Sequence, residues 1–140
     1  MDLVEKSVQL PCSLERAFAL FTDRIDDWWP PARRHSKHPE SVIALSADRF
    51  WEFAPDGDEV ELGRVRAWEP PNRIVLEWFP GTDPEHPTLV EVDFISVKEG
   101  TEVRITHRAT AQSLELFPLR APRYAASWDL VLAALLAAEP

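Results

Sequence analysis

Between residues 42 and 110 the chain carries six strand-like segments separated only by short turns, and this spacing constrains its topology more than any other feature. The segments lie near residues 42–46, 49–54, 59–68, 73–79, 88–97 and 102–110. Proline, glycine, asparagine and aspartate punctuate the turns, as in Pro55-Asp56-Gly57. Parallel strands need crossover connections of a dozen or more residues, which these turns cannot provide. The segments therefore predict an antiparallel meander.

One further strand and two short helices are expected before the meander. Val4–Leu10 alternates in polarity and ends at Pro11, which predicts a first strand. Residues 14–23 follow helical spacing, with Ser13 as the N-cap. A second short helix is predicted over Ile25–Trp29, because the prolines at 30 and 31 prevent its continuation.

The chain returns to a helical period after the meander. Residues 122–138 predict a long helix with Pro122 in its first turn. Its expected apolar stripe consists of Tyr124, Trp128, Val131, Leu132, Leu135 and Leu136. Such a stripe must lie on the sheet, which predicts an α+β fold: a curved antiparallel sheet wrapped around a long C-terminal helix, with two short helices after the first strand.

Length and charge bound the possible functions. The chain has 140 residues, of which 45% are hydrophobic, so we expect a single domain over 1–140. Its 15 basic and 24 acidic residues give a net charge of −9, which argues against nucleic acids and anionic membranes as partners. The longest apolar run, Leu130–Ala138, is too short to span a bilayer. The single cysteine, Cys12, predicts a reducing, cytoplasmic location.

The sequence offers little for metal or cofactor chemistry. His35 and His38 have the spacing of paired metal ligands, but they lie in a proline-rich loop and nothing nearby completes a site. With 4 glycines in the whole chain, a phosphate-cradling loop has little to be built from. Cys12 precedes a helix, where a thiol pKa can fall, although a buried structural thiol is favoured. We predict no metal, no cofactor and no catalytic nucleophile.

His107 shares a strand face with Val103, Ile105 and Ala109, while charged residues alternate on the other face. Two interpretations stay open: a polar group that orients a ligand or transfers protons, or a hydrogen-bonded core histidine. The carboxylates Glu77, Glu91 and Asp93 are expected on the solvated outer face. There we expect them to pair with arginines, listed as Arg64, Arg66, Arg104 and Arg108.

Aromatic residues are the strongest compositional signal, with 6 tryptophans and 7 phenylalanines. They predict bulky core packing, an aromatic-lined cavity, or both. The pair Trp28-Trp29, directly before two prolines, is a candidate lid at the mouth of such a cavity.

Several motifs together resemble one family. They are Glu15-Arg16-Ala17-Phe18, Trp28-Trp29-Pro30, Phe50-Trp51-Glu52-Phe53, the stretch from Gly63 to Trp78, Gly100 to His107, and Trp128. This pattern resembles the activator of heat-shock protein 90 ATPase homologue family, within the SRPBCC superfamily of START and birch-pollen-allergen-like proteins. The chain departs from the family pattern at Asp48-Arg49 and at Ser127, where glycines are usual.

The resemblance implies a helix-grip fold with an apolar cavity between the sheet and the long helix. We expect a small hydrophobic ligand as the partner, bound without catalysis. The expected ligand-binding residues are Trp51, Phe53, Trp78, Phe94, Ile105, His107, Tyr124, Trp128 and Leu132. Two alternatives remain: a polyketide cyclase- or aromatase-like enzyme, and a module that binds a chaperone.

Overall fold

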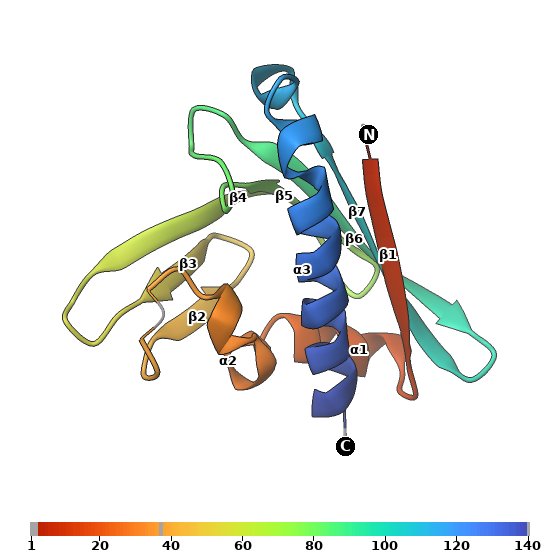
Figure 1. Ribbon diagram of the computed structural model, residues 1–140. Coiled ribbons are helices and arrows are strands. Elements are labelled where there is room, and N and C mark those ends of the chain that lie inside the picture. The colour runs from red at the N-terminus through yellow and green to blue at the C-terminus, as the bar shows by residue number, and fades with distance from the viewer. Residues whose placement is uncertain (1–2, 37, 140) are drawn as a thin grey trace.

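Seven strands form one antiparallel sheet in the computed structural model, which describes residues 3–36 and 38–139 (Figure 1). The strands are β1 (Leu3–Leu10), β2 (Val42–Leu45), β3 (Phe50–Phe53), β4 (Glu59–Glu69), β5 (Arg73–Trp78), β6 (Thr88–Val97) and β7 (Gly100–Ala109). Their order across the sheet is β1-β7-β6-β5-β4-β3-β2, and every neighbouring pair is antiparallel. The predicted meander is confirmed, and the N-terminal strand β1 extends the sheet at one edge by pairing with the last strand, β7.

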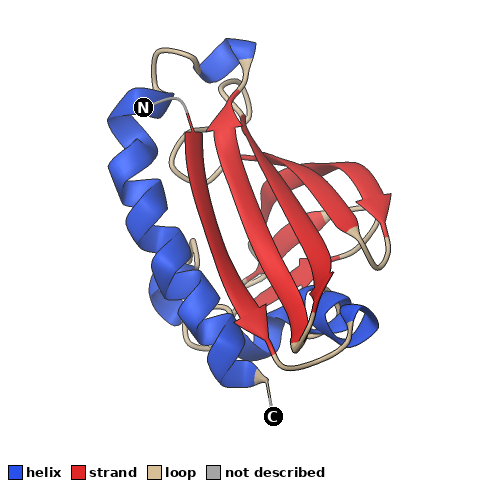
Figure 2. Ribbon diagram, turned by 90° about the vertical axis from the view of Figure 1, so that its right-hand side faces the viewer, coloured by secondary structure: helices blue, strands red, loops and turns tan. Residues whose placement is uncertain are grey.

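The helices follow the predicted order. They are α1 (Leu14–Phe21), α2 (Ile25–Trp28) and α3 (Phe117–Ala138). Ser13 caps α1 as expected, because its side chain accepts a hydrogen bond from the backbone N–H of Arg16 at 3.2 Å. Helix α3 runs along one face of the sheet, close to β1, so the α+β helix-grip fold is confirmed (Figures 1 and 2). Among the described residues, no helix combines the length and hydrophobicity that a bilayer crossing requires.

Two details of the predicted C-terminal helix are wrong. It begins at Phe117 rather than 122, because Pro118 occupies the first turn, where a missing N–H costs nothing. Pro122 therefore lies inside the helix and removes one backbone bond, which would have reached the exposed residue Pro118. Leu136 is 43% exposed and does not belong to the buried stripe, which the other predicted members do form.

The register of the sheet separates an apolar inner face from a charged outer face. On the inner face of β7, Val103, Ile105 and His107 are fully buried, and they lie opposite buried residues of β6. On the outer face, Glu91 pairs with Arg108 and Arg73. Glu77 pairs there with Arg64 and Arg66, while Arg104 pairs with Glu102, its neighbour on the same strand. Asp93 lies 3.7 Å from Arg73, so the expected outer set of arginine-paired carboxylates is confirmed, although Arg73 takes the place expected for Arg104.

The glycine at the β6–β7 turn brings this hairpin against the end of β1. Gly100 has a φ of +151°, and a Cβ there would lie 2.0 Å from the carbonyl oxygen of Leu10. Only glycine allows this approach. The turn thus fixes the point where β1 leaves the sheet and α1 begins.

Candidate functional site: the aromatic interior

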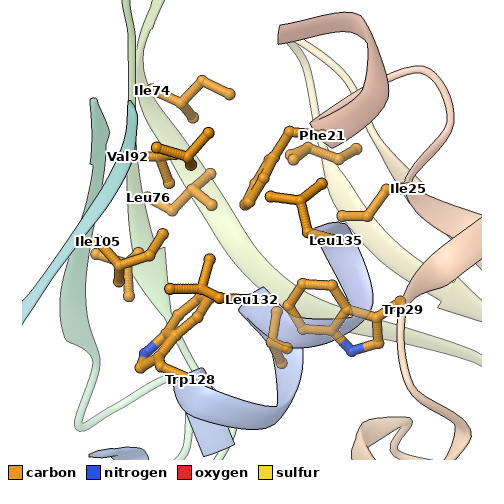
Figure 3. Packing of buried hydrophobic residues seen from close by; sticks show 14 of the residues in the cluster. Phe21, Ile25, Trp29, Ile74, Leu76, Val92, Ile105, Trp128, Leu132 and Leu135 are labelled. Carbon is orange, nitrogen blue, oxygen red and sulfur yellow. The ribbon is translucent and has the colours of Figure 1, made fainter. Parts of the chain in front are cut away.

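Aromatic rings from four different segments meet between α3 and the sheet. The ring centroids of Trp128 on α3 and Trp78 on β5 are 5.2 Å apart. Trp29, which directly follows α2, lies 6.1 Å from Trp78, 6.3 Å from Trp128 and 6.4 Å from Phe50 of β3. Figure 3 shows Trp29 reaching inward from its loop towards α3. Trp29 therefore occupies the centre of the space where a ligand cavity is expected.

His107 lies in this interior, and both of its ring nitrogens are hydrogen-bonded. The indole N–H of Trp128 donates to Nδ1 at 3.0 Å, and Thr88 Oγ1 lies 2.7 Å from Nε2. An indole can only donate, so Nδ1 is an acceptor and Nε2 carries the proton of the neutral ring. Thr88 Oγ1 therefore accepts from Nε2, and its own hydroxyl hydrogen points to the carbonyl of Trp78 at 3.2 Å.

Burial keeps this imidazole neutral. It lowers the pKa of His107 from 6.5 to about 3, because the charged form loses its hydration inside the protein. The ring of Tyr124 packs over the imidazole with centroids 4.1 Å apart, and its hydroxyl donates to the carbonyl of Pro80 at 2.9 Å. Of the two interpretations of His107, this geometry matches the hydrogen-bonded core histidine.

The structure brings seven of the nine expected ligand-binding residues to the inner face. They are Trp78, Phe94, Ile105, His107, Tyr124, Trp128 and Leu132, all of them buried. Phe94 lies apart from the rings around Trp128, because it packs against Phe18 and Phe21 of α1.

Trp51 and Phe53 do not join this group, which corrects the sequence prediction. They lie on the outer face of β3, where their rings stack 6.4 Å apart beneath the guanidinium of Arg49. The strand Phe50–Phe53 has aromatic rings on both faces, and its inner pair is Phe50 and Glu52. Because one of the two buried residues of β3 is a glutamate, a hydrophobicity pattern does not identify the inner face of this strand.

Sequence reasoning missed Glu52, a buried carboxylate that anchors a loop beside the aromatic interior. Its carboxylate is 1% exposed and accepts hydrogen bonds from the backbone N–H groups of His35 at 2.7 Å and Ser36 at 2.8 Å. Burial alone would raise the pKa of Glu52, but the hydrogen bonds from Ser36 and His35 outweigh it and hold the pKa below 4.5. Glu52 thus anchors the proline-rich loop to the sheet.

Arg34 holds the same loop from within. Its buried guanidinium donates to the carbonyls of Trp29 and Ser41 and forms an ion pair with Asp26 at 2.6 Å. Trp28 and Trp29 are 7% and 5% exposed, so they are part of the core and do not cover a mouth as the lid hypothesis expected. Only the Trp-Trp-Pro motif signalled this arrangement, and it gave no indication of the direction in which the rings point.

Other predicted groups lie outside the interior. The thiol of Cys12 has its pKa raised to about 11, first by burial and then by the carboxylate of Glu139. Within residues 3–36 and 38–139 no three metal-ligating side chains gather, and His38 Nδ1 accepts from the backbone of Glu40. The structure also shows two hollows away from the aromatic rings: one of about 480 Å³ near Arg66, and one of about 380 Å³ beside α1.

Comparison with known proteins places this geometry in context. A family model described as "Activator of Hsp90 ATPase homolog 1-like protein" matches residues 11–137. No curated protein matches the chain.

Solved structures share the fold at low sequence identity. A protein from Rhodobacter sphaeroides is 18% identical, with a TM-score of 0.67 over 96% of this chain and 89% of that one. An AHSA1-like protein from Aeromonas hydrophila is 18% identical, with a TM-score of 0.63 over 96% and 89%. DynU16, from the dynemicin biosynthetic locus, is 18% identical, with a TM-score of 0.66 over 97% of this chain but 46% of its own. Identities this low establish the shared fold alone.

Proposed function

This chain belongs to the family of Activator of Hsp90 ATPase homolog 1-like proteins, and we propose that it binds a small, flat, apolar molecule between the sheet and α3 without catalysing a reaction. The observation that carries the proposal is the position of Trp29. A residue outside the regular elements inserts an indole among three other aromatic rings. A ligand of similar shape would find the same contacts in its place.

Replacing Trp29 by a ligand sets the free energy lost when the indole leaves the interior against the free energy gained when the ligand is buried. Burying one indole removes roughly 150–250 Å² from water, which corresponds to about 4–6 kcal/mol at ~25 cal/mol per Å². A ligand that displaces Trp29 must recover this free energy and the cost of association. Molecules larger than an indole, which also reach Leu132 and Tyr124, are therefore favoured over smaller ones.

The polar groups of the interior support binding more than catalysis. Both nitrogens of His107 are engaged, and burial holds its pKa far below neutrality. The carboxylates Glu91 and Asp93 lie on the opposite face of the sheet, paired with arginines, so they cannot share a proton pathway with the imidazole. A cyclase-like mechanism finds no free acid or base at these positions.

We also propose a cytoplasmic location, in keeping with the lone free thiol of Cys12.

The test is an NMR titration with flat aromatic compounds and, separately, fatty acids, following the indole N–H signals. We expect micromolar binding that shifts the Trp128 signal. Trp29→Ala should tighten binding by at least about tenfold, because the ligand no longer competes with the indole. Trp29→Phe, which preserves the packing better, should tighten it less. Trp51→Ala, on the outer face, is the matched control and should leave the affinity unchanged.

Two outcomes would overturn the proposal. One is that no compound shifts the Trp128 signal in the wild type or in either Trp29 variant. The other is that both Trp29 variants weaken binding while remaining folded. A purified chaperone that binds without shifting the interior signals would then favour the chaperone-binding alternative.

A further inference from the structure

A surface groove of about 380 Å³ separates α1 from the turn between β4 and β5. One wall is α1 and its C-terminal extension, with Glu15, Ala19 and Asp23 facing the groove. The other wall is formed by Trp68, Pro70 and Pro71. This volume falls within the range of about 300–1,000 Å³ that is typical of small-molecule sites.

The walls of the groove are apolar and partly exposed. Trp68 is half-buried and meets Phe18 edge to face, with ring centroids 5.4 Å apart. The indole N–H of Trp68 donates to no group in the part of the chain that the structure describes. Prolines lie beside it. An aliphatic chain lying along these rings would bury apolar surface on both sides.

The two ends of the groove are acidic. Glu15 and Ala19 share one face of α1, and Asp23 lies in the turn two residues beyond its end; all three line the groove. Glu15 is in the first turn of α1 and Asp23 follows its last turn, so the two acids lie at opposite ends of the stretch that carries Phe18 and Ala19. The groove therefore presents one carboxylate near each end, with hydrocarbon between them.

These two carboxylates differ from the other acids around the sheet. Across residues 3–36 and 38–139, neither Glu15 nor Asp23 forms an ion pair or accepts a hydrogen bond. Glu77 and Glu91, by contrast, are each paired with two arginines. The net charge of −9 adds a general attraction for cations.

We propose that this groove binds linear aliphatic diamines and polyamines. The carbon chain would lie on Trp68 and the prolines, while the terminal ammonium groups reach Glu15 and Asp23. The indole face adds a favourable contact for a nearby cation. The site does not depend on the interior site, because its ligand carries two or more positive charges and its walls do not include Trp29, Trp78 or Trp128.

The test is isothermal titration of the full chain with spermidine, supported by NMR of the Trp68 indole N–H signal. We expect saturable binding that shifts this signal and weakens as salt is added. Replacing both acids, Glu15→Gln with Asp23→Asn, should weaken binding about tenfold, as expected for two exposed ion pairs. Octylamine, whose single ammonium group can form only one of the two ion pairs, should bind the wild type more weakly than spermidine does.

The matched control removes the same charge elsewhere. Glu5→Gln with Glu115→Gln neutralises two exposed carboxylates away from the groove and should change the affinity less than about twofold. The proposal is wrong if both double variants weaken binding equally, because that result indicates general charge attraction. It is also wrong if the wild type shows no saturable binding, or if spermidine shifts signals outside the groove only.

Discussion

Replacing His107 by leucine should make the stability of the protein less dependent on pH. In the folded protein burial lowers the pKa of this imidazole to about 3, against 6.5 for an unperturbed histidine. At neutral pH the variant loses the acceptor for the Trp128 indole N–H, a buried donor left without a partner. Such a loss costs about 1–3 kcal/mol.

The sign of the pH effect follows from the lowered pKa. Below pH 6.5 the unfolded chain binds a proton at His107 that the folded protein refuses until about pH 3. Stability is therefore complete above 6.5 and falls by about 1.4 kcal/mol for each pH unit below it. Two units lower, the wild type has lost about 2.7 kcal/mol through this residue alone, which is comparable to the advantage of about 1–3 kcal/mol that it holds at neutral pH.

Urea unfolding of both proteins between about pH 7.5 and pH 4.5 measures the effect. Carboxylates titrate in both proteins and cancel in the difference between the two free energies of unfolding. That difference should shrink towards zero or change sign as the pH falls. A difference that stays constant over this range would show that the imidazole is not buried in its neutral form, and the assigned hydrogen bonds would be wrong.

Three further predictions concern Trp29, Cys12 and Glu52. Trp29→Ala should lower the free energy of urea unfolding by about 3–5 kcal/mol, whereas Trp51→Ala on the outer face should cost less than about 1.5 kcal/mol. The Cys12 thiolate should be about 100-fold scarcer at neutral pH than for an ordinary thiol, so labelling with Ellman's reagent should be slow, and Glu139→Gln should accelerate it. Glu52→Gln should cost about 1–3 kcal/mol above pH 5 and less below pH 4, as unfolding at the two pH values would show, because the lowered pKa makes its stabilisation disappear in acid.

The meander and the long helix were predictable because their signals are local. Turn residues, alternation and helical spacing each act within a few positions, and they correctly placed every strand to within two residues. The start of α3 was predicted five residues late because two prolines, at 118 and 122, competed for the first turn. The sequence prediction placed Pro122 in the first turn, but the helix begins at Phe117, whose ring is buried.

The candidate site was less predictable because two of its determinants are polar contacts between residues outside a single helix or strand. The face of β3 is set by Glu52, whose burial is compensated by hydrogen bonds from Ser36 and His35, 16 and 17 residues earlier in the chain. Arg34 sets the orientation of Trp29. Its guanidinium donates to the carbonyl of Trp29 and is itself held by the carbonyl of Ser41 and the carboxylate of Asp26. Hydrophobicity patterns carry no information about such polar contacts.

The same polar contacts define how Trp29 would leave the interior. The bonds of Arg34 to Asp26, Trp29 and Ser41 join residues that precede β2 to one another, so none of them ties Trp29 to the sheet. Among the described residues, the hydrogen bonds that tie the stretch 26–41 to the sheet are those accepted by Glu52 and the bond from the backbone of Ile43 to Asp26. A shift of this stretch that displaces the indole would break those bonds and, if Trp28 moved with it, the bond from the Trp28 indole N–H to the carbonyl of Leu20. A ligand that replaces the aromatic contacts of Trp29 must still offset those bonds and the cost of association, which is why molecules larger than an indole are favoured.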